Sequence, residues 1–506
     1  MSRVVPEKTS HATAAPIGGK ARLALYALLG FSAGLPFYMF STVLGLRLQA
    51  HGVVLVVIGF FAWVQLLPTF KFLWAPLLDR YDVPGFGRFW GRRRGWIMLS
   101  QLGIFTAMTA MAFTASDASL GLTALFAVLL AFWTTTLEVA ADAWRIELAP
   151  TQAEQGPVVA ANLWGYRTAM VAAGSGALIV ADAPGWGWRA AYLVIAAAAF
   201  IPCPILCAMR GDPGGRGGRT VALATGLVGG GAILIAVAVA TAAIGWAVLT
   251  AAAGLGIGAQ SNVTPYVLVV CMLPFLAMAA AVPRIRTLPP NSPWRRSAVV
   301  GPYIDFFWRF GFAAIVLMAF VSLNRMGDVL ALNLSKPMIR ELGYTLTQIG
   351  RADSVVALVA SMVGVALGGW LVTRWPQAWT LAAGALFAAI GNFGFVWLAH
   401  QRVDEWLLYV ATAADQFGNG LAGAVFVVYL SMLVNPRYPG AQYAFLSGFA
   451  FLLPRLLAGA GGDMVRHIGY DGFFLLAGAL SLAVIPLLPV VTRIRPRPDD
   501  MTGPPR

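Results

Sequence analysis

Charged residues inside otherwise apolar stretches are the residues of this sequence most able to do chemistry. Glu138 and Asp142 lie four residues apart, so on a helix their carboxylates share one face. Two carboxylates this close repel each other, and a membrane interior penalises charge, so one is expected to hold a proton near neutral pH. Such a carboxyl suits a proton-coupled transporter. The alternative is a structural ion pair with Arg145 or Arg167 that joins two helices.

Other polar residues within apolar runs extend this set. Asp328 follows Arg325 by three residues, and Asp415 is followed directly by Gln416. Guanidinium groups bind carboxylate or phosphate bidentately, which suits an anionic substrate, although pairing between helices is the other interpretation. The candidate proton carriers are Glu138, Asp142, Asp328 and Asp415. The candidate substrate-binding residues are Lys71, Tyr166, Arg167, Arg325, Gln416 and Arg455.

A third group lies in a polar loop. Asp79 and Arg80 end one apolar run, and Arg92 and Arg93 precede the next. A carboxylate in this position can hold a helix N-terminus or an arginine, and so latch one side of the protein in one state. The pattern therefore predicts a gating loop, with a simple topology anchor as the alternative.

The sequence contains no pattern that predicts a metal site or an enzyme active site. Cys203, Cys207 and Cys271 lie inside apolar runs, and the four histidines lie in the N-terminal tail or near predicted loops. We recognise no nucleophile motif and no pair of catalytic aspartates on facing helices. We expect no cofactor and no metal, and an intramembrane enzyme is the weakest hypothesis.

The elements that position these residues must be membrane helices. The 506 residues are 59% hydrophobic and only 11% charged, unlike a soluble domain, and the apolar residues run continuously and do not alternate as in a β-barrel. The net charge of +14 reflects short basic loops. Such loops mark the cytoplasmic side of a membrane protein, and they contain no long basic, aromatic-rich stretch for nucleic acid.

The sequence predicts fourteen spans, six before and six after a central pair. The first six lie near 23–46, 53–76, 96–115, 119–144, 157–181 and 189–209; the central pair near 221–250 and 264–283; the last six near 311–334, 346–373, 378–399, 405–434, 441–461 and 472–491. Arginines concentrate in the loops after the second, fourth and sixth spans, counting Arg145 among them. Both termini are therefore expected in the cytoplasm.

An internal repeat relates the two sets of six spans. Gly52-x-x-Leu55-x-x-Ile58-Gly59 recurs as Gly343-x-x-Leu346-x-x-Ile349-Gly350. A second echo pairs Arg167, Gly174 and Gly176 with Arg455, Gly459 and Gly461. Two six-helix bundles around a central cavity describe the major facilitator fold. The expected organisation is a disordered cytoplasmic tail (1–20), an N-terminal bundle (21–210), a linker with two inserted helices (211–301), a C-terminal bundle (302–492) and a cytoplasmic tail (493–506).

Several segments together resemble one family of this superfamily. They are residues 30–36 (GFSAGLP), 70–81 (FKFLWAPLLDRY), 91–96 (GRRRGW), 142–144 (DAW), 165–167 (GYR), 326–328 (MGD), 442–447 (QYAFLS) and Arg455. The chain thereby resembles the AmpG-type muropeptide permeases, which are themselves similar to acetyl-CoA transporters. One departure is Leu137-Glu138, where the family usually has Gln-Asp, so that an amide contact is missing while the charge is kept.

The resemblance implies a carrier in the bacterial inner membrane. It would import anhydro-muropeptides from periplasm to cytoplasm by proton symport for peptidoglycan recycling, a process tied to β-lactamase induction. The partners would be the muropeptide, protons and membrane lipid, with no nucleic acid, and the protein would act as a monomer. Two alternatives stay open: a carrier of another anionic conjugate such as a CoA ester, and a membrane assembly or pigment-delivery factor on the same fold.

Overall fold

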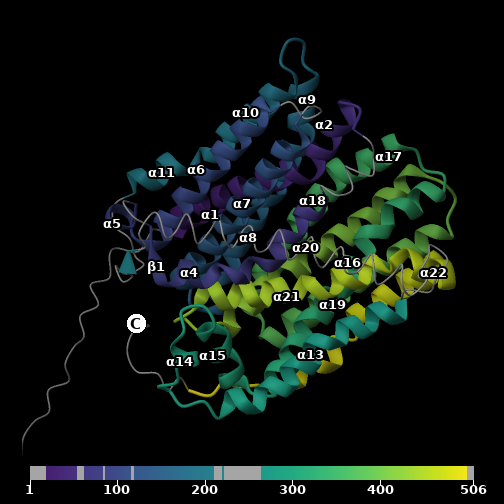
Figure 1. Cartoon of the computed structure of the whole chain (residues 1–506). Coiled ribbons are helices and arrows are strands. Elements are labelled where there is room, and N and C mark those ends of the chain that lie inside the picture. Colours follow the sequence, from purple (N-terminus) through teal and green to yellow (C-terminus); the bar gives the residue numbers. More distant parts are fainter. Residues whose placement is uncertain are drawn as a thin grey trace, which may run out of the picture.

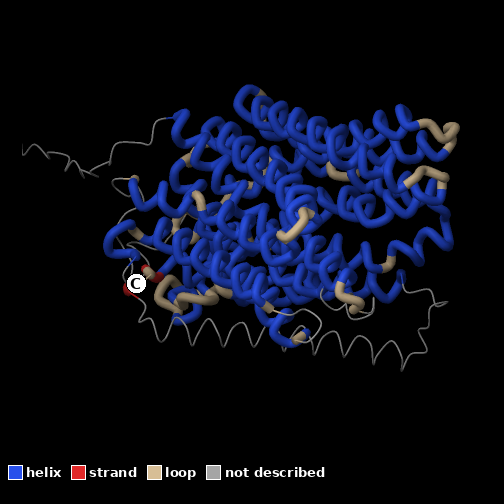
Figure 2. Tube along the Cα trace, turned by 90° about the horizontal axis from the view of Figure 1, so that it is seen from above, coloured by secondary structure: helices blue, strands red, loops and turns tan. Residues whose placement is uncertain are grey.

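The computed structural model describes residues 19–53, 62–83, 86–114, 119–209, 219–220 and 264–498. These residues are almost entirely helical, as Figure 2 shows, which confirms the all-α class. One two-stranded parallel pairing, β1 (Tyr81–Asp82) with β2 (Arg219–Thr220), is the sheet that they contain. The N-terminal helical elements are α1 Gly19–Tyr38, η1 Met39–Val43, α2 Leu44–Ala50, η2 Ala62–Leu73, α4 Ala75–Arg80, α5 Phe86–Trp90, α6 Arg92–Phe113, α7 Leu120–Leu148, α8 Gln152–Val171, η3 Ala172–Gly176, α9 Ala177–Asp182, α10 Gly187–Phe200 and α11 Pro202–Ala208.

The C-terminal elements begin with a long helix from the expected central pair. They are α13 Thr264–Arg286, α14 Pro293–Arg296, α15 Gly301–Phe310, α16 Ala313–Glu341, α17 Leu346–Arg351, η4 Ala352–Val356, α18 Ala357–Arg374, α19 Gln377–Ala399, α20 Glu405–Leu433, α21 Pro439–Gly459, α22 Gly461–Leu482, η5 Ile485–Leu487 and α23 Leu488–Val491. Among all these segments, η1, η3 and η4 are π-helical, and η2 and η5 are 3₁₀-helical.

Eleven helices in the described part of the chain are long and apolar enough to cross a membrane. The expected count of fourteen is not confirmed. The span near 221–250 lies outside the described residues, as do 1–18, most of the linker and the last eight residues of the C-terminal tail. The span near 157–181 is present but interrupted by the π-helical η3. The last span begins at Gly461, earlier than the expected 472, with a break at Gly469.

The second expected span departs from a regular α-helix. Its described part is the 3₁₀ segment η2, followed by a turn at Trp74 and the short helix α4. Pro68 lies in the middle of η2. Proline has no backbone N–H to donate, and its ring clashes with the carbonyl four residues before it, so a tighter helix replaces the α-helix.

The N-terminal and C-terminal helices occupy different parts of the molecule (Figure 1). In the N-terminal part α1 packs on α8 and α6 packs on α7 and α10; in the C-terminal part α20 packs on α18 and α19, and α16 on α21 and α22. The two parts meet where α8 packs on α18, and where α21 packs on α7 and η2. Each part has its own apolar core, and Ala441 and Ala444 of α21 belong to the N-terminal core.

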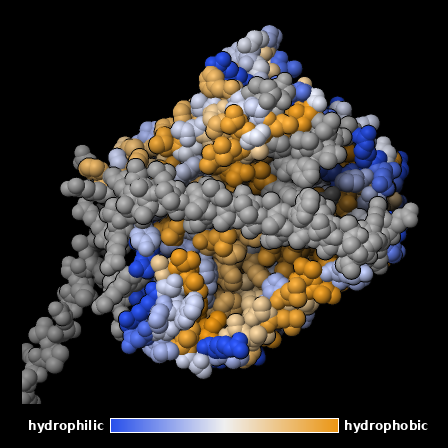
Figure 3. Space-filling model, in the orientation of Figure 1, coloured by the Kyte–Doolittle hydropathy of each residue, from blue (hydrophilic) through white to orange (hydrophobic). Residues whose placement is uncertain are grey.

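The outer surface matches a membrane environment. Figure 3 shows apolar side chains over much of the visible face, with hydrophilic ones toward its edges. Helix α13 exposes a row of large apolar side chains, and its first residue, Thr264, donates its backbone N–H and its hydroxyl to Asp463 of α22. The described helix of the central insertion therefore packs against the outside of the C-terminal helices.

Two ends of the molecule carry the helix connections. We call the end that contains α4, α5, α14, α15 and the start of α8 the basic end; it includes Arg92 and Arg93. At the opposite end, Gly52 and Gly343 occupy matching repeat positions and both have positive φ, at 76° and 100°. Glycine is favoured there because a side chain is strained in that conformation. The rest of the first repeat, 54–59, lies outside the described residues.

Candidate functional site

Lys71 and Glu138 form an ion pair between η2 and α7. The Nζ–Oε2 distance is 3.8 Å, and the two side chains are 10% and 24% exposed. The 3₁₀ geometry of η2 directs Lys71 toward α7, so the break at Pro68 has a consequence for the site. The sequence suggested arginine partners for Glu138, whereas the structure pairs it with a lysine.

Asp142 forms an ion pair with Arg145, which is the structural alternative to a role as a proton carrier. Arg145 Nη2 lies 3.0 Å from Asp142 Oδ1, one turn along α7. Arg145 was expected in a polar loop, but it lies in the last turn of α7 and is fully buried because it fills the contact with the C-terminal helices. Its Nη1 donates to Ser431 Oγ of α20 at 3.0 Å, and its guanidinium lies 5.3 Å from the Tyr443 ring of α21.

Arg455 of α21 reaches across to the N-terminal helices. Its Nη1 donates to Thr69 Oγ1 of η2 at 2.6 Å, and its guanidinium lies 5.4 Å from the Phe451 ring. Seven residues earlier on the same face, a Cβ added at Gly448 would stand 2.5 Å from the Thr69 carbonyl oxygen. The backbones of η2 and α21 therefore approach closely, and Thr69 contacts α21 through both its carbonyl and its hydroxyl.

Arg167 of α8 occupies the matching position in the other half of the repeat. Its guanidinium makes a weak polar contact from Nη1 to Met170 Sδ at 3.8 Å. Its charge interacts with Tyr38 of α1 and Tyr166 of α8, and across to Asp415 of the C-terminal helices. Among the residues the structure describes, no carboxylate forms an ion pair with Arg167 or Arg455. Two guanidinium groups from different halves thus stay uncompensated by direct pairing.

The remaining carboxylates lie on α16 and α20. Arg325 Nη1 donates to Asp328 Oδ2 at 2.8 Å within α16, and the Arg325 guanidinium lies 5.3 Å from the same Phe451 ring that Arg455 approaches. Gln416 Nε2 donates to Asp415 Oδ2 at 2.9 Å. The charges of Asp415 and Asp328 are close enough to interact. Asp415 therefore differs from its neighbours in having an amide as its direct partner, where they have a cation.

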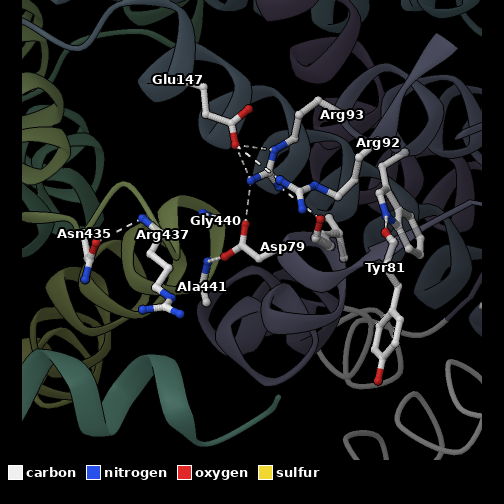
Figure 4. Close-up of polar contacts among 11 residues, drawn as sticks. Asp79, Tyr81, Arg92, Arg93, Glu147, Asn435, Arg437, Gly440 and Ala441 are labelled. Carbon is white, nitrogen blue, oxygen red and sulfur yellow. Dashed lines mark hydrogen bonds and ion pairs between the residues drawn. The ribbon is translucent and has the colours of Figure 1, made fainter. Parts of the chain in front are cut away.

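The loop that the sequence predicts to act in gating forms a buried contact between the two parts of the molecule (Figure 4). Asp79 accepts hydrogen bonds from the backbone N–H groups of Gly440 at 3.0 Å and Ala441 at 2.7 Å, in the first turn of α21. Arg93 Nη2 lies 2.8 Å from Asp79 Oδ1 and 2.6 Å from Glu147 Oε1. A carboxylate at a helix N-terminus satisfies free N–H groups and complements the helix dipole. Asp79 thus contacts both a helix N-terminus and an arginine, and its role as a latch stays a prediction.

Other members of that loop play smaller parts. Arg92 lies 3.7 Å from Glu147, and Arg80 stacks over Tyr81 with 5.7 Å between guanidinium and ring centre. Glu147 itself was missed from the sequence, although an acidic residue at the end of a span beside basic residues was a usable signal. Arg93 and Asp79 are buried and Glu147 is partly buried, so these residues form a packed junction.

Helix α15 adds a second junction at the basic end. Asp305 accepts hydrogen bonds from Gln442 Nε2 at 2.8 Å and Asn435 Nδ2 at 3.1 Å, and Tyr303 donates its hydroxyl to the Phe72 carbonyl of η2. Helix α15, at the start of the expected C-terminal bundle, thus contacts both parts of the chain. Asp305 is a site residue that the sequence reasoning missed, although its four-residue spacing from Arg309 amid aromatic residues was a usable signal.

Helices α8 and α18 cross closely toward the same end. A Cβ added at Gly156 would stand 2.5 Å from the Gly369 carbonyl oxygen. Gln152 Nε2 donates to the Val372 carbonyl at 3.0 Å, and Trp164 Nε1 donates to the Met362 carbonyl at 2.8 Å. Together with the Asp79 and Arg145 contacts, these bonds join the two parts of the molecule from the basic end toward the middle of the helices.

Comparisons with known proteins agree with this architecture. A family model described as Major Facilitator Superfamily matches residues 314–506. The anhydromuropeptide permease of Escherichia coli (strain K12) is 28% identical over 472 residues, which cover 92% of this chain and 79% of that protein. A putative transporter AmpG 4 of Rickettsia conorii is 26% identical over 461 residues, covering 91% of this chain and 94% of that protein.

Solved structures show the same fold at low sequence identity. The proton:xylose symporter XylE bound to 6-bromo-6-deoxy-D-glucose is 12% identical, with a TM-score of 0.59 and coverage of 94% of this chain and 95% of that one. The Escherichia coli fucose:proton symporter FucP is 13% identical, with a TM-score of 0.53 and coverage of 92% and 97%. The chain is therefore a multi-pass transporter with the major facilitator fold, and not an enzyme, and it is related over most of its length to the AmpG-type permeases.

Proposed function

We propose that the protein imports anhydro-muropeptides across the bacterial inner membrane by proton symport, for peptidoglycan recycling. The observation that carries the proposal is the pair of guanidinium groups without direct carboxylate partners, Arg167 and Arg455. They come from repeat-related positions in the two halves, and both interact electrostatically with Tyr166. A muropeptide combines peptide carboxylates, which match guanidinium groups, with sugar rings, which match aromatic side chains.

The proposed transport cycle is alternating access between the two helix bundles. The basic end is proposed to face the cytoplasm, which places both termini there and makes the state described here closed to the cytoplasm. Substrate would enter from the opposite, periplasmic end and meet Arg167 of α8 and Arg455 of α21. The protein would do this as a monomer in membrane lipid.

For proton coupling, we propose Asp415 as the first candidate among the four carboxylates. Glu138, Asp142 and Asp328 each have a cation within ion-pair distance, whereas Gln416 is the direct partner of Asp415. A carboxylate held by a neutral amide, near the charges of Asp328 and Arg167, can take up and release a proton as those charges move. The other three act mainly by holding the cations of the pathway in place.

The test is uptake of labelled anhydro-muropeptide into proteoliposomes with an imposed pH gradient. Accumulation that requires the pH gradient and is abolished by an uncoupler supports the proposal. Absence of uptake would show that the proposed substrate is wrong. Uptake that the uncoupler does not change would show that the proposed proton coupling is wrong. Asp415→Asn should lose gradient-driven accumulation but keep exchange of internal for external substrate. Arg455→Gln should lose both, while Arg402→Gln, a control at an exposed residue of the opposite end, should keep both.

The alternatives from the sequence have their own signatures in the same experiment. Competition by acetyl-CoA as strong as competition by unlabelled muropeptide would favour a carrier of CoA esters. Absence of any uptake, together with a stable co-purifying protein, would favour an assembly factor.

A further inference from the structure

Thr69 is a polar residue of the bundle interface to which neither the repeat nor the family resemblance assigns a role. It is buried, 3% exposed, and its hydroxyl accepts a hydrogen bond from Arg455 at 2.6 Å. This bond joins η2 of the N-terminal bundle to α21 of the C-terminal bundle. Arg455 is also one of the two cations to which the proposed function assigns the substrate anion. The same side chain therefore stabilises the closed bundles and binds the ligand.

The geometry around Thr69 shows why this contact depends on closure. The Thr69 carbonyl lies so near Gly448 that a Cβ there would stand 2.5 Å from it. Long helical side chains point back toward the N-terminus of their helix, so Arg455 extends along α21 toward the level of Gly448, two turns earlier. When α21 and η2 separate, the backbone contact and the hydrogen bond must both break.

The chemistry of the partner matters as much as its position. A threonine hydroxyl is a neutral, single acceptor, whereas a carboxylate or phosphate carries a negative charge and accepts two parallel hydrogen bonds from one guanidinium. An arriving anion therefore outcompetes Thr69 for the Arg455 guanidinium. A carboxylate at position 69 would instead hold Arg455 permanently, as Asp328 holds Arg325 in the same structure.

We propose that Thr69 is a positioning residue that holds Arg455 while the basic end is closed and yields it to the substrate anion. Anion binding and separation of α21 from η2 are then one event. The inference rests on the proposed function for the identity of the anion, and it adds the route by which binding weakens the closure. The anion needs only a carboxylate or phosphate group, because that is the chemistry that competes with the hydroxyl.

The test follows opening directly, without transport. Ala444 of α21 is 1% exposed and packs within the N-terminal core, so a thiol there is reached only when the bundles part at the basic end. Ala444→Cys is placed in a chain whose three native cysteines are replaced by alanine, and its rate of reaction with a water-soluble maleimide is measured. The anions added are anhydro-muropeptide, acetyl-CoA and inorganic phosphate, each in a separate arm.

Substitutions at Thr69 should move that rate in opposite directions. Thr69→Val keeps the shape and removes the acceptor, so labelling should speed up by roughly tenfold to a hundredfold, the value of a hydrogen bond to a charged group. Thr69→Ser should restore the parent rate. Thr69→Asp should slow labelling and abolish any acceleration by anions. Thr168→Val, which removes a hydroxyl bonded within α8 alone, is the matched control and should change nothing.

Kinetics separate this role from a general packing defect. Thr69→Val should lower both KM and kcat for uptake, because the anion no longer displaces a competitor while the bundles close again less readily. A packing defect lowers kcat without lowering KM. An anion should accelerate labelling of the parent chain and have little further effect on Thr69→Val.

The outcomes distinguish the inference from the function on which it rests. If acetyl-CoA or phosphate accelerates labelling through Thr69 and muropeptide does not, the inference holds and the proposed substrate is wrong. If muropeptide is taken up but no anion accelerates labelling, the inference is overturned and the function stands. Labelling of Thr69→Val at the parent rate also overturns the inference.

Discussion

Replacing Asp79 by asparagine should weaken the closure of the basic end without unfolding the N-terminal bundle. Asp79 accepts two backbone hydrogen bonds from Gly440 and Ala441, and these are the bonds that cross to α21. Its other partner, Arg93, lies in its own bundle and keeps Glu147 and the Leu78 carbonyl as acceptors after the substitution. The variant therefore removes a contact between bundles and leaves a satisfied arginine behind.

The size of the effect follows from the geometry. Asparagine offers one acceptor oxygen, and its NH₂ group faces the second backbone N–H, so at least one of the two bonds is lost. A hydrogen bond to a charged acceptor contributes ~1.5–3 kcal/mol. At about 1.4 kcal/mol per factor of ten, the population open at the basic end should rise roughly tenfold to a hundredfold. Loss of the charge at the α21 N-terminus acts in the same direction.

Hydrogen exchange at the first turn of α21 measures this population. The amides of Gly440 and Ala441 donate to Asp79, so their exchange reports opening of that contact. In Asp79→Asn, the amides of a peptide covering residues 438–446 should exchange roughly tenfold to a hundredfold faster than in the parent chain. Peptides from α10 should keep the parent rate, because that helix packs on α6, α9 and α1 within the N-terminal bundle.

Glu147→Gln is the matched control. Glu147 forms its ion pairs with Arg92 and Arg93, both inside the N-terminal bundle. Its loss should leave the exchange of 438–446 within a small factor of the parent. Unchanged exchange in Asp79→Asn, or an equal rise in both variants, would refute the argument that Asp79 latches the end through the helix N-terminus.

Two further substitutions test packing and burial. Gly156→Ala should lower the melting temperature and open the basic end, because the new Cβ would stand 2.5 Å from the Gly369 carbonyl oxygen and overpacking costs ~1–3 kcal/mol; Gly121→Ala, with no atom within 4 Å, should not. Burial raises the pKa of the Asp82 carboxyl despite the nearby Arg92 and Arg93, so its ionised form is disfavoured in the folded state and stability falls as pH rises through that pKa. Asp82→Asn should therefore raise the melting temperature near neutral pH and leave it unchanged in acid, where both forms are neutral; an equal shift at both pH values contradicts the reasoning.

Periodicity and composition determined the helical membrane class, because a continuous apolar run of about 20 residues has few structures available in lipid. The same logic singled out the intramembrane charges: each is costly there, so Glu138, Arg167, Asp415 and Arg455 stood out without any coordinates. The repeat placed Arg167 and Arg455 at equivalent positions, and the structure brings both toward Tyr166. Asp79 was assigned a helix N-terminus or an arginine, and it contacts both.

Which groups are neighbours was decided only by the tertiary structure. Arg145 reads as a loop charge because it follows an apolar run, yet the packing of α7 against α20 and α21 buries it. The 3₁₀ turn at Pro68 sets where Lys71 and Thr69 point, and no spacing rule for a regular α-helix predicts that. Pairing across the bundles joins residues hundreds of positions apart, such as Thr69 and Arg455. Local sequence patterns determine how each helix forms and which face is apolar, but the crossing of helices determines which polar groups meet.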